Sequence, residues 1–252
     1  MNVIKLYGGL GNQMFQYALG KTMETFGIPV AYEISFFNRH QDPPRPLRIN
    51  KFRTNLQISP FLQQTMIHET DYYNFDPFIF TMKNTNFFGY WQHLKYIEQV
   101  LPALKAEYRL LPGVHTDEYT NYKEQIISRE SVALHVRRGD YVKINGHVVE
   151  PMEYYQKALL KVQGQLFVFS DDITWCRENF KDAIFVDIDD YLAFDLFRIC
   201  KHKILANSTF SLWAAILKDD GIIINPSQWR ENLEEQTKLR NSGLIKDTWL
   251  TI

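Results

Sequence analysis

The sequence predicts an α/β fold of two doubly wound domains that face each other, each built on a parallel sheet. Short apolar segments with the length of buried strands alternate with segments in which apolar residues recur at helical spacing, most regularly after residue 130. Four successive apolar segments of this second half end in polar clusters, and in a parallel sheet such ends lie along one edge. We expect the two domains to cover residues 1–125 and 126–252.

The chain begins with a predicted strand, glycine-rich turn, helix and second strand. The strands are expected at residues 3–7 and 28–34, and the helix at 14–26. A helix that starts after such a turn can meet a phosphate with its N-terminus. Gly11 belongs to this turn, and Asn12 and Gln13 have side chains that could reach a ligand; the alternative for Asn12 is a helix cap. The dinucleotide fingerprint needs a third glycine where Met14 stands, so a dinucleotide site with Glu33 on the ribose stays only an alternative.

The rest of the first half is less regular. Residues 36–50 are polar and rich in proline, which predicts a long loop at an active site or an acceptor. A strand is expected at 84–91, and helices are expected at 61–70, 95–104 and 118–128. Aromatic residues gather between Tyr72 and Trp91; we expect most of them in the core and a few against a sugar ring.

The second half repeats one strand-helix unit several times. Strands are expected at 131–136, 165–169, 183–186, 203–206 and 221–224, and helices at 152–162, 173–180, 192–202, 212–217 and 228–240. Strands that alternate with helices in this way form parallel sheets with right-handed crossovers.

The strand that ends at residue 136 leads into the most informative stretch of the chain. Side chains alternate along a strand, so His135 and Arg137 are predicted to share one face and Arg138 to point away. Gly139 permits a sharp exit and close approach of a ligand. An imidazole and a guanidinium that project together suit an anion, because arginine pairs with phosphate through two hydrogen bonds. The alternative is a salt bridge between Arg138 and Asp140 that closes a turn.

Three other strand ends carry candidate site residues. Hydroxyls and backbone N–H groups at Asn207-Ser208-Thr209-Phe210-Ser211 can form a phosphate cradle, or Ser208 can be a plain helix cap. Asp187 and Asp189 could hold a divalent metal beside a diphosphate, or be a solvated strand end, which we favour. Ser170, Asp171 and Asp172 are typical of a helix cap, with contact to a nucleoside as the alternative.

Composition limits the function. A net charge of −1 without a long basic stripe argues against a nucleic-acid partner. Cys176 and Cys200 are expected to be reduced core residues, and the sequence has no His/Cys metal spacing. No apolar run is long enough to span a bilayer, so we expect a cytoplasmic protein; peripheral membrane association stays open.

Four motifs together resemble the α-1,2-fucosyltransferases of glycosyltransferase family 11. They are Gly8-Gly9-Leu10-Gly11-Asn12-Gln13-Met14-Phe15-Gln16-Tyr17, His135-Val136-Arg137-Arg138-Gly139-Asp140-Tyr141, Phe169-Ser170-Asp171-Asp172 and Asn207-Ser208-Thr209-Phe210-Ser211. The resemblance implies a GT-B fold, GDP-fucose as donor substrate, inversion at the anomeric carbon, no cofactor and no required metal. It also implies a galactose-terminated oligosaccharide or lipid-linked glycan as acceptor. Animal members carry a membrane anchor that is not visible here, which suggests a bacterial enzyme.

The resemblance also implies roles for individual residues. Residues 1–125 would form the acceptor side and residues 126–252 would bind GDP-fucose. Arg137 would bind the diphosphate and His135 would help to hold the nucleoside. Asn12, with Gly11 and Gln13 beside it, would reach the phosphate or the fucose from the first domain. The donor site would be completed by Ser170, Asp171, Asp187, Ser208, Thr209 and Phe210. Asp140 is the acid nearest in sequence to the expected phosphate site and is our candidate base. A related enzyme with another donor or acceptor, or a non-catalytic nucleotide- or glycan-binding protein, stays open.

Overall fold

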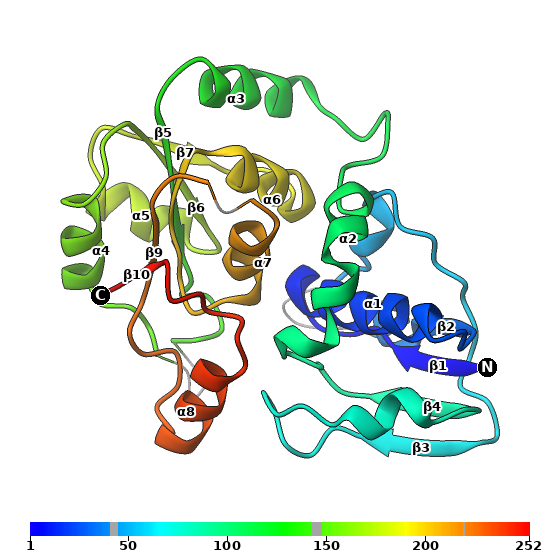
Figure 1. Cartoon of the computed structure of the whole chain (residues 1–252). Helices are drawn as coiled ribbons and strands as arrows, with labels where there is room; N and C mark the ends of the chain where they lie inside the picture. Colours follow the sequence, from blue (N-terminus) through cyan, green and yellow to red (C-terminus); the bar gives the residue numbers. More distant parts are fainter. Residues whose placement is uncertain (41–44, 143–147, 219) are drawn as a thin grey trace. The chain divides into compact units, whose positions relative to one another are not determined.

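The computed structural model describes residues 1–40, 45–142, 148–218 and 220–252, which form two compact units (Figure 1). The N-terminal unit comprises Met1–Leu111 and Thr237–Leu244, and the C-terminal unit comprises Pro112–Gln236 and Ile245–Ile252. A boundary between residues 125 and 126 would cut helix α3 (Asp117–Ile127), whereas the units divide at the turn before this helix. The return of residues 237–244 to the first unit was not expected either.

The N-terminal unit contains a four-stranded parallel sheet in the order β2-β1-β4-β3. Its strands are β1 (Asn2–Lys5), β2 (Val30–Glu33), β3 (Thr65–His68) and β4 (Thr85–Phe88). Helix α1 (Leu10–Thr25) joins β1 to β2, and twelve of its sixteen residues are buried. Short 3-10 turns at Leu94–Tyr96 and Glu98–Val100 precede helix α2 (Leu101–Glu107).

The C-terminal unit contains a six-stranded parallel sheet in the order β10-β9-β8-β5-β6-β7. The strands are β5 (Ser131–Val136), β6 (Gln165–Ser170), β7 (Ala183–Val186), β8 (His202–Ile204), β9 (Ile223–Asn225) and β10 (Leu250–Thr251). The connecting helices are α4 (Met152–Leu159), α5 (Ile173–Asn179), α6 (Asp190–Ile199) and α7 (Thr209–Leu217). Helix α8 (Leu233–Asn241) begins in this unit and ends in the segment that belongs to the N-terminal unit. This is the strand order 3-2-1-4-5-6 of dinucleotide-binding sheets. The predicted fold class, α/β with parallel sheets, is therefore confirmed.

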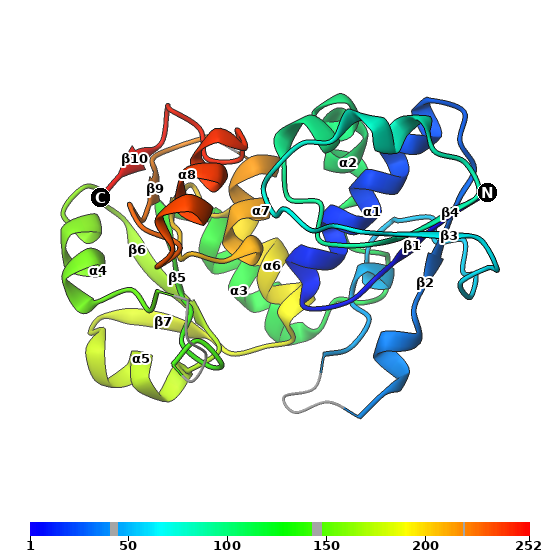
Figure 2. The same ribbon diagram turned by 90° about the horizontal axis from the view of Figure 1, so that it is seen from below.

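Strand β5 marks the point where the winding of this sheet reverses. It lies between β6 and β8, so the chain leaves β5 first toward one edge of the sheet and later returns to build the other. Helices α4 and α5 cover one face and α6 and α7 the other (Figure 1 and Figure 2). Loops that diverge at such a point leave a crevice at the carboxyl ends of the strands, which is where open α/β sheets bind ligands.

The alternation of β5 side chains that the sequence predicts is present. Its three even-numbered positions pack into a core with α4 and α5; these are Val132, Leu134 and Val136. The His135 ring faces the other helices, with its centroid 6.0 Å from that of Phe197 in α6 and 5.1 Å from that of Phe210 in α7. Both cysteines are buried and free, as expected.

Two local predictions are wrong. Residues 61–70 contain strand β3 instead of a helix; three of the four β3 residues are exposed, so the strand carries little apolar signal. Helix α1 begins at Leu10, four residues before the expected start, and Gly9 is its N-cap. Asn12 therefore lies inside the first turn and is not the helix cap.

Candidate functional site

Arg137 lies directly after β5, at the carboxyl edge of the C-terminal sheet. Its Nη1 is 2.6 Å from Oδ2 of Asp171, which follows β6, and its Nη2 forms an ion pair with Asp140. The guanidinium carbon lies 4.9 Å from the centroid of the Tyr141 ring. The side chain keeps 19% of its surface exposed. A guanidinium fixed in this way is oriented before any ligand binds, and its remaining N–H groups can still bind an anion.

Asp171 joins the two arginines of this edge. Its Oδ2 pairs with Arg137, and its Oδ1 accepts a 2.9 Å hydrogen bond from the backbone N–H of Arg138. The carboxylate fits because residue 139 is glycine: a Cβ at that position would lie 2.4 Å from Asp171 Oδ2. Gly139 is thus required by the close approach of Asp171.

Arg138 points to the opposite face, toward α5. Its guanidinium carbon lies 4.2 Å from the centroid of the Trp175 ring, and its Nε is 3.2 Å from Oδ2 of Asp172. Asp172 also caps α5, because its Oδ1 accepts a hydrogen bond from the Trp175 N–H. The proposed salt bridge between Arg138 and Asp140 is absent: Asp140 pairs with Arg137 and Arg138 with Asp172.

His135 holds the strand against the segment that follows β8. The residue is 6% exposed, and its Nδ1 lies 3.0 Å from Ser211 Oγ. Ser211 Oγ is also within hydrogen-bond distance of the carbonyl oxygens of Ala206 and Ser208. A hydroxyl that donates to a carbonyl must accept from His135, so we assign the proton to Nδ1. Burial, with a smaller contribution from Arg137, lowers the pKa of His135 to about 3, so the ring is neutral at ordinary pH.

The segment between β8 and α7 supplies the predicted hydroxyl and N–H groups. Ser208 is the N-cap of α7 and accepts from the Phe210 N–H, as the simpler alternative expected. Thr209 opens the helix, and Phe210 packs on His135. Within the described part of the chain, the buried Oδ1 of Asn207 has no hydrogen-bond partner. Asn207 is therefore a further candidate for ligand contact at the same edge.

Arg230 is a basic residue near this edge that sequence analysis did not single out. Burial raises the pKa of the Tyr141 hydroxyl, and Arg137 and Arg230 both oppose this rise. Tyr141 is also bonded to the neighbouring loop, since its hydroxyl donates to the Asn207 carbonyl over 3.3 Å. Arg230 lies after β9 in a polar stretch without a strand-end pattern, which is why its position could not be foreseen.

Two predicted site residues have other surroundings. Asp187 is exposed after β7, the edge strand, and β6 separates that strand from β5. Ser170 ends β6, and its Oγ accepts from the Asp172 N–H over 2.9 Å, so it supports the start of α5. The structure therefore brings together Arg137, Asp140, Asp171 and Tyr141, but it does not bring Asp187 to them.

The glycine-rich turn belongs to the N-terminal unit. Gln13 is fully buried; its Nε2 donates to the carbonyls of Gly8 and Pro46, and its Oε1 accepts from the N–H groups of Arg48 and Ile49. The Gln13 side chain thus positions two loops. Its amide nitrogen and amide oxygen, which a ligand would need as donor and acceptor, are both used in these four bonds. Asn12 is half-buried, and its Oδ1 accepts from Gln92 Nε2 over 3.0 Å. Gly11 is buried in the first turn of α1.

Glu150 is a buried acid just before α4, and its ionisation makes the stability of the folded protein depend on pH. It is 7% exposed, and its Oε1 has no partner among the described residues. Burial raises the pKa of its carboxyl to about 8. The folded state therefore binds the proton more tightly than the unfolded chain, and stability falls as pH rises from about 4.5 through 8.

We expect Glu150→Gln to stabilise the protein at pH 9 and to have little effect at pH 5. The amide cannot ionise, so the variant avoids the cost of a buried charge, on the order of a few kcal/mol. Melting temperatures at both pH values measure this. Glu153→Gln, at an exposed position of α4 that pairs with Lys157, is the matched control and should show no such gain. Equal melting curves for Glu150→Gln and the wild type at pH 9 would contradict a raised pKa for the buried Glu150 carboxyl.

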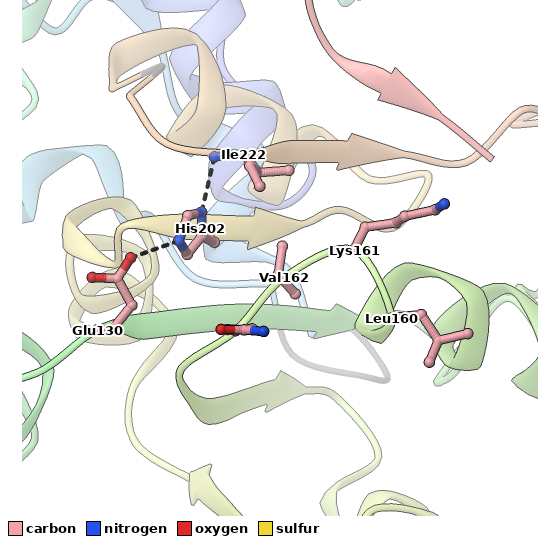
Figure 3. Close-up of a pocket in the computed structure, with 7 residues that line it drawn as sticks. Glu130, Leu160, Lys161, Val162, His202 and Ile222 are labelled. Carbon is pink, nitrogen blue, oxygen red and sulfur yellow. Dashed lines mark hydrogen bonds and ion pairs between the residues drawn. The ribbon is translucent and has the colours of Figure 1, made fainter.

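A hollow of about 480 Å³ lies at the opposite, amino edge of the same sheet (Figure 3). Glu130, His202 and Ile222 line it with Leu160, Lys161, Val162 and Gln163. His202 Nδ1 accepts from the Ile222 N–H, so its Nε2 carries the proton and bonds to Glu130. Both ring nitrogens of His202 are thus used in hydrogen bonds, which connect the start of β8 to the residues just before β5 and β9. Ligands of open parallel sheets bind at the other edge, so we place the functional site there.

The described residues contain no group of three or more His, Cys, Asp or Glu side chains arranged to hold a metal ion. Over the same residues, none of the helices combines the length and the apolar character needed to cross a membrane.

Comparison with known proteins assigns the chain to a family. The family model for glycosyl transferase family 11 matches residues 1–252. The chain is 28% identical to the O-antigen biosynthesis glycosyltransferase WbnK of Escherichia coli, over 98% of this chain and 99% of that protein. It is 30% identical to an α-1,2-colitosyltransferase of Escherichia coli, over 92% and 93%, respectively. It is 25% identical to galactoside α-(1,2)-fucosyltransferase 2 of Mus musculus, over 85% and 67%.

Solved structures support the fold. NodZ α-1,6-fucosyltransferase soaked with GDP-fucose matches with a TM-score of 0.50 and 12% identity, over 86% of this chain and 92% of that one. POFUT1 in complex with GDP matches with a TM-score of 0.51 and 12% identity, over 87% and 94%. Both have a GT-B-like fold. The chain is a glycosyltransferase that belongs to family 11.

Proposed function

We propose that this enzyme transfers L-fucose from GDP-fucose to the 2-hydroxyl of a galactoside, with inversion at the anomeric carbon. The proposal rests on one observation. Two carboxylates hold Arg137 at the carboxyl edge of the C-terminal sheet, next to β5, where the winding of that sheet reverses. That position suits a nucleoside diphosphate. The names of the relatives support the linkage, since two of them are α-1,2-transferases.

The donor would lie at the carboxyl ends of β5, β6 and β8. The remaining N–H groups of Arg137 and the first N–H groups of α7 would bind the diphosphate. When the bond between the anomeric carbon and the β-phosphate oxygen breaks, negative charge grows on that oxygen. A guanidinium already fixed by Asp140 and Asp171 can meet this charge without reorganising. Arg230, whose positive charge acts on Tyr141 and whose Nε lies 3.8 Å from Oε2 of Glu235, would add positive charge near this site.

The acceptor we propose is a galactose-terminated oligosaccharide or a lipid-linked glycan. The relative named for O-antigen biosynthesis supports an acceptor in surface-polysaccharide assembly. We propose a cytoplasmic enzyme with peripheral access to a membrane.

Calorimetric titration with GDP-fucose, GDP-mannose and UDP-galactose, followed by product analysis with lactose, tests this function. We expect GDP-fucose to bind most tightly and the product to carry fucose on O2 of the galactose. Binding of the nucleotide sugars without any product would favour a non-catalytic binding protein. Preference for UDP-galactose would contradict the proposed donor.

A second candidate is transfer of colitose, because a bacterial relative bears that activity in its name at 30% identity. The same assay with GDP-colitose separates the two donors. A much higher turnover with GDP-colitose than with GDP-fucose would replace the first proposal by this one.

We expect transfer to be independent of divalent metal ions. Arg137 and the backbone donors of α7 would neutralise the leaving diphosphate in place of a cation. Turnover measured after dialysis against EDTA should equal that of the untreated enzyme. Loss of activity in EDTA that magnesium or manganese restores would contradict this prediction.

A further inference from the structure

Asn207 carries a buried polar atom that no other group in the described part of the chain satisfies. The residue is 4% exposed, and its Oδ1 has no hydrogen-bond partner among the described residues. Nearly all buried polar atoms of folded proteins are hydrogen-bonded, because an unpaired one has lost its hydration without compensation. A ligand with a hydrogen-bond donor would supply the missing partner.

The orientation of the Asn207 amide is fixed by two loops. Its Nδ2 donates to the carbonyl of Val148, before α4, and to that of Trp229, after β9. The reversed amide would set an oxygen against two carbonyl oxygens, so the unpaired atom is the amide oxygen, a hydrogen-bond acceptor. Since the two ends of an amide point apart, Oδ1 points away from both carbonyls.

Asn207 lies at the point where the winding of the C-terminal sheet reverses. It follows β8, which pairs with β5, and it comes two residues before α7. Its backbone carbonyl accepts a 3.3 Å hydrogen bond from the hydroxyl of Tyr141, whose ring lies against the Arg137 guanidinium. Tyr141 thus connects Asn207 to the arginine, and all of these residues belong to one unit. The unpaired oxygen therefore stands at the edge where open α/β sheets bind ligands.

A buried acceptor at this edge suits one part of a nucleoside diphosphate better than the others. Phosphate oxygens are themselves acceptors, so they cannot satisfy Asn207 Oδ1. A sugar hydroxyl rotates to suit its partner and does not need a fixed one. The edge of a base, in contrast, holds its N–H groups in fixed directions that a fixed acceptor can match. Guanine has two neighbouring N–H groups, at N1 and N2, whereas N1 of adenine has no proton.

We propose that Asn207 selects the nucleobase of the donor, and that its Oδ1 accepts a hydrogen bond from N1–H or N2–H of guanine. This inference rests on the proposed function, in which the donor is GDP-fucose. Adenine would set the lone pair of its N1 against the same oxygen and leave two acceptors unpaired. Asn207 thus favours guanine by a bond and disfavours adenine by repulsion.

Base selectivity tests the proposal, through calorimetric titration of GDP, ADP and 2′-deoxy-GDP into the wild type and Asn207→Ala. The wild type should bind GDP at least about tenfold more tightly than ADP. In Asn207→Ala this preference should fall by about tenfold, the effect of one hydrogen bond to a buried group. The preference for GDP over 2′-deoxy-GDP should be equal in both proteins, because Oδ1 does not contact the ribose.

Asn225→Ala is the matched control. Asn225 is a buried asparagine at the end of β9, and its Oδ1 accepts a 3.0 Å hydrogen bond from Trp229 Nε1. The variant loosens the loop that Asn207 also holds, but the acceptor that it removes already has a partner. We expect a lower melting temperature and an unchanged preference for GDP over ADP. A loss of preference as large as that in Asn207→Ala would show that the loop, and not Oδ1, selects the base.

Asn207→Ser serves if Asn207→Ala does not fold. The serine hydroxyl can donate to one of the two carbonyls that Nδ2 now bonds, which preserves part of the contact between the loops. It does not restore the amide oxygen, so the same loss of preference is expected.

The outcomes separate this inference from the proposed function. A wild type that binds GDP and ADP equally, or a folded Asn207 variant that keeps the full preference for GDP, would overturn the role of Asn207. Weaker binding of GDP-fucose by the variant with unchanged binding of GDP would also overturn it, since the contact would then be to the sugar. A wild type that does not bind GDP at all would instead reject the proposed donor.

Discussion

Arg137→Ala is expected to lower turnover by about a hundredfold or more, in line with the loss of one preorganised donor to a developing charge. The variant removes the guanidinium that Asp140 and Asp171 orient at the end of β5. Arg137→Lys should recover little, because a single ammonium cannot reproduce the planar pair of donors. Steady-state turnover with GDP-fucose and lactose measures both variants.

Arg138→Ala is the matched control, one residue further along the chain. Its side chain packs on Trp175 and pairs with Asp172, on the α5 face. We therefore expect its loss to lower the melting temperature and to leave turnover near that of the wild type. An Arg137→Ala enzyme that is folded and fully active would remove the basis of the proposed donor site.

Gly139→Ala is expected to lower turnover by about tenfold to a hundredfold, the range for losing a charge-assisted hydrogen bond. The added methyl would lie 2.4 Å from Asp171 Oδ2, so the carboxylate must move away. Arg137 and the Arg138 N–H would then lose a partner. The same assay, together with the melting temperature, measures the effect.

A double-mutant cycle tests the cause. If the methyl acts through Asp171, then Gly139→Ala should add little to the effect of Asp171→Ala, because the clashing group is already gone. Effects of the two changes that multiply in the double variant would show that Gly139 acts in another way.

The sequence was most informative where the pattern was regular. The apolar run that ends in Arg137 predicted a buried strand, and the alternation placed His135 and Val136 on opposite faces. The partners of Arg137 were not predictable. Asp140 is three residues away, but whether it turns to Arg137 or Arg138 depends on the loop, and Asp171 reaches the site only through the pairing of β5 with β6.

The N-terminal unit was less predictable for a physical reason. Its β3 is a largely exposed edge strand, so burial left no apolar signature there. Gln13 was expected to reach a ligand, yet it binds four backbone groups of nearby loops, which depends on the fold of residues 45–49.

Calorimetric titration of GDP into the wild type, Arg137→Ala and Arg138→Ala tests the central claim, that Arg137 binds the donor diphosphate. We predict that Arg137→Ala weakens GDP binding by about tenfold or more, as expected for a lost hydrogen bond between charged groups. Arg138→Ala should bind GDP like the wild type. Wild-type affinity for GDP in a folded Arg137→Ala protein would contradict the account.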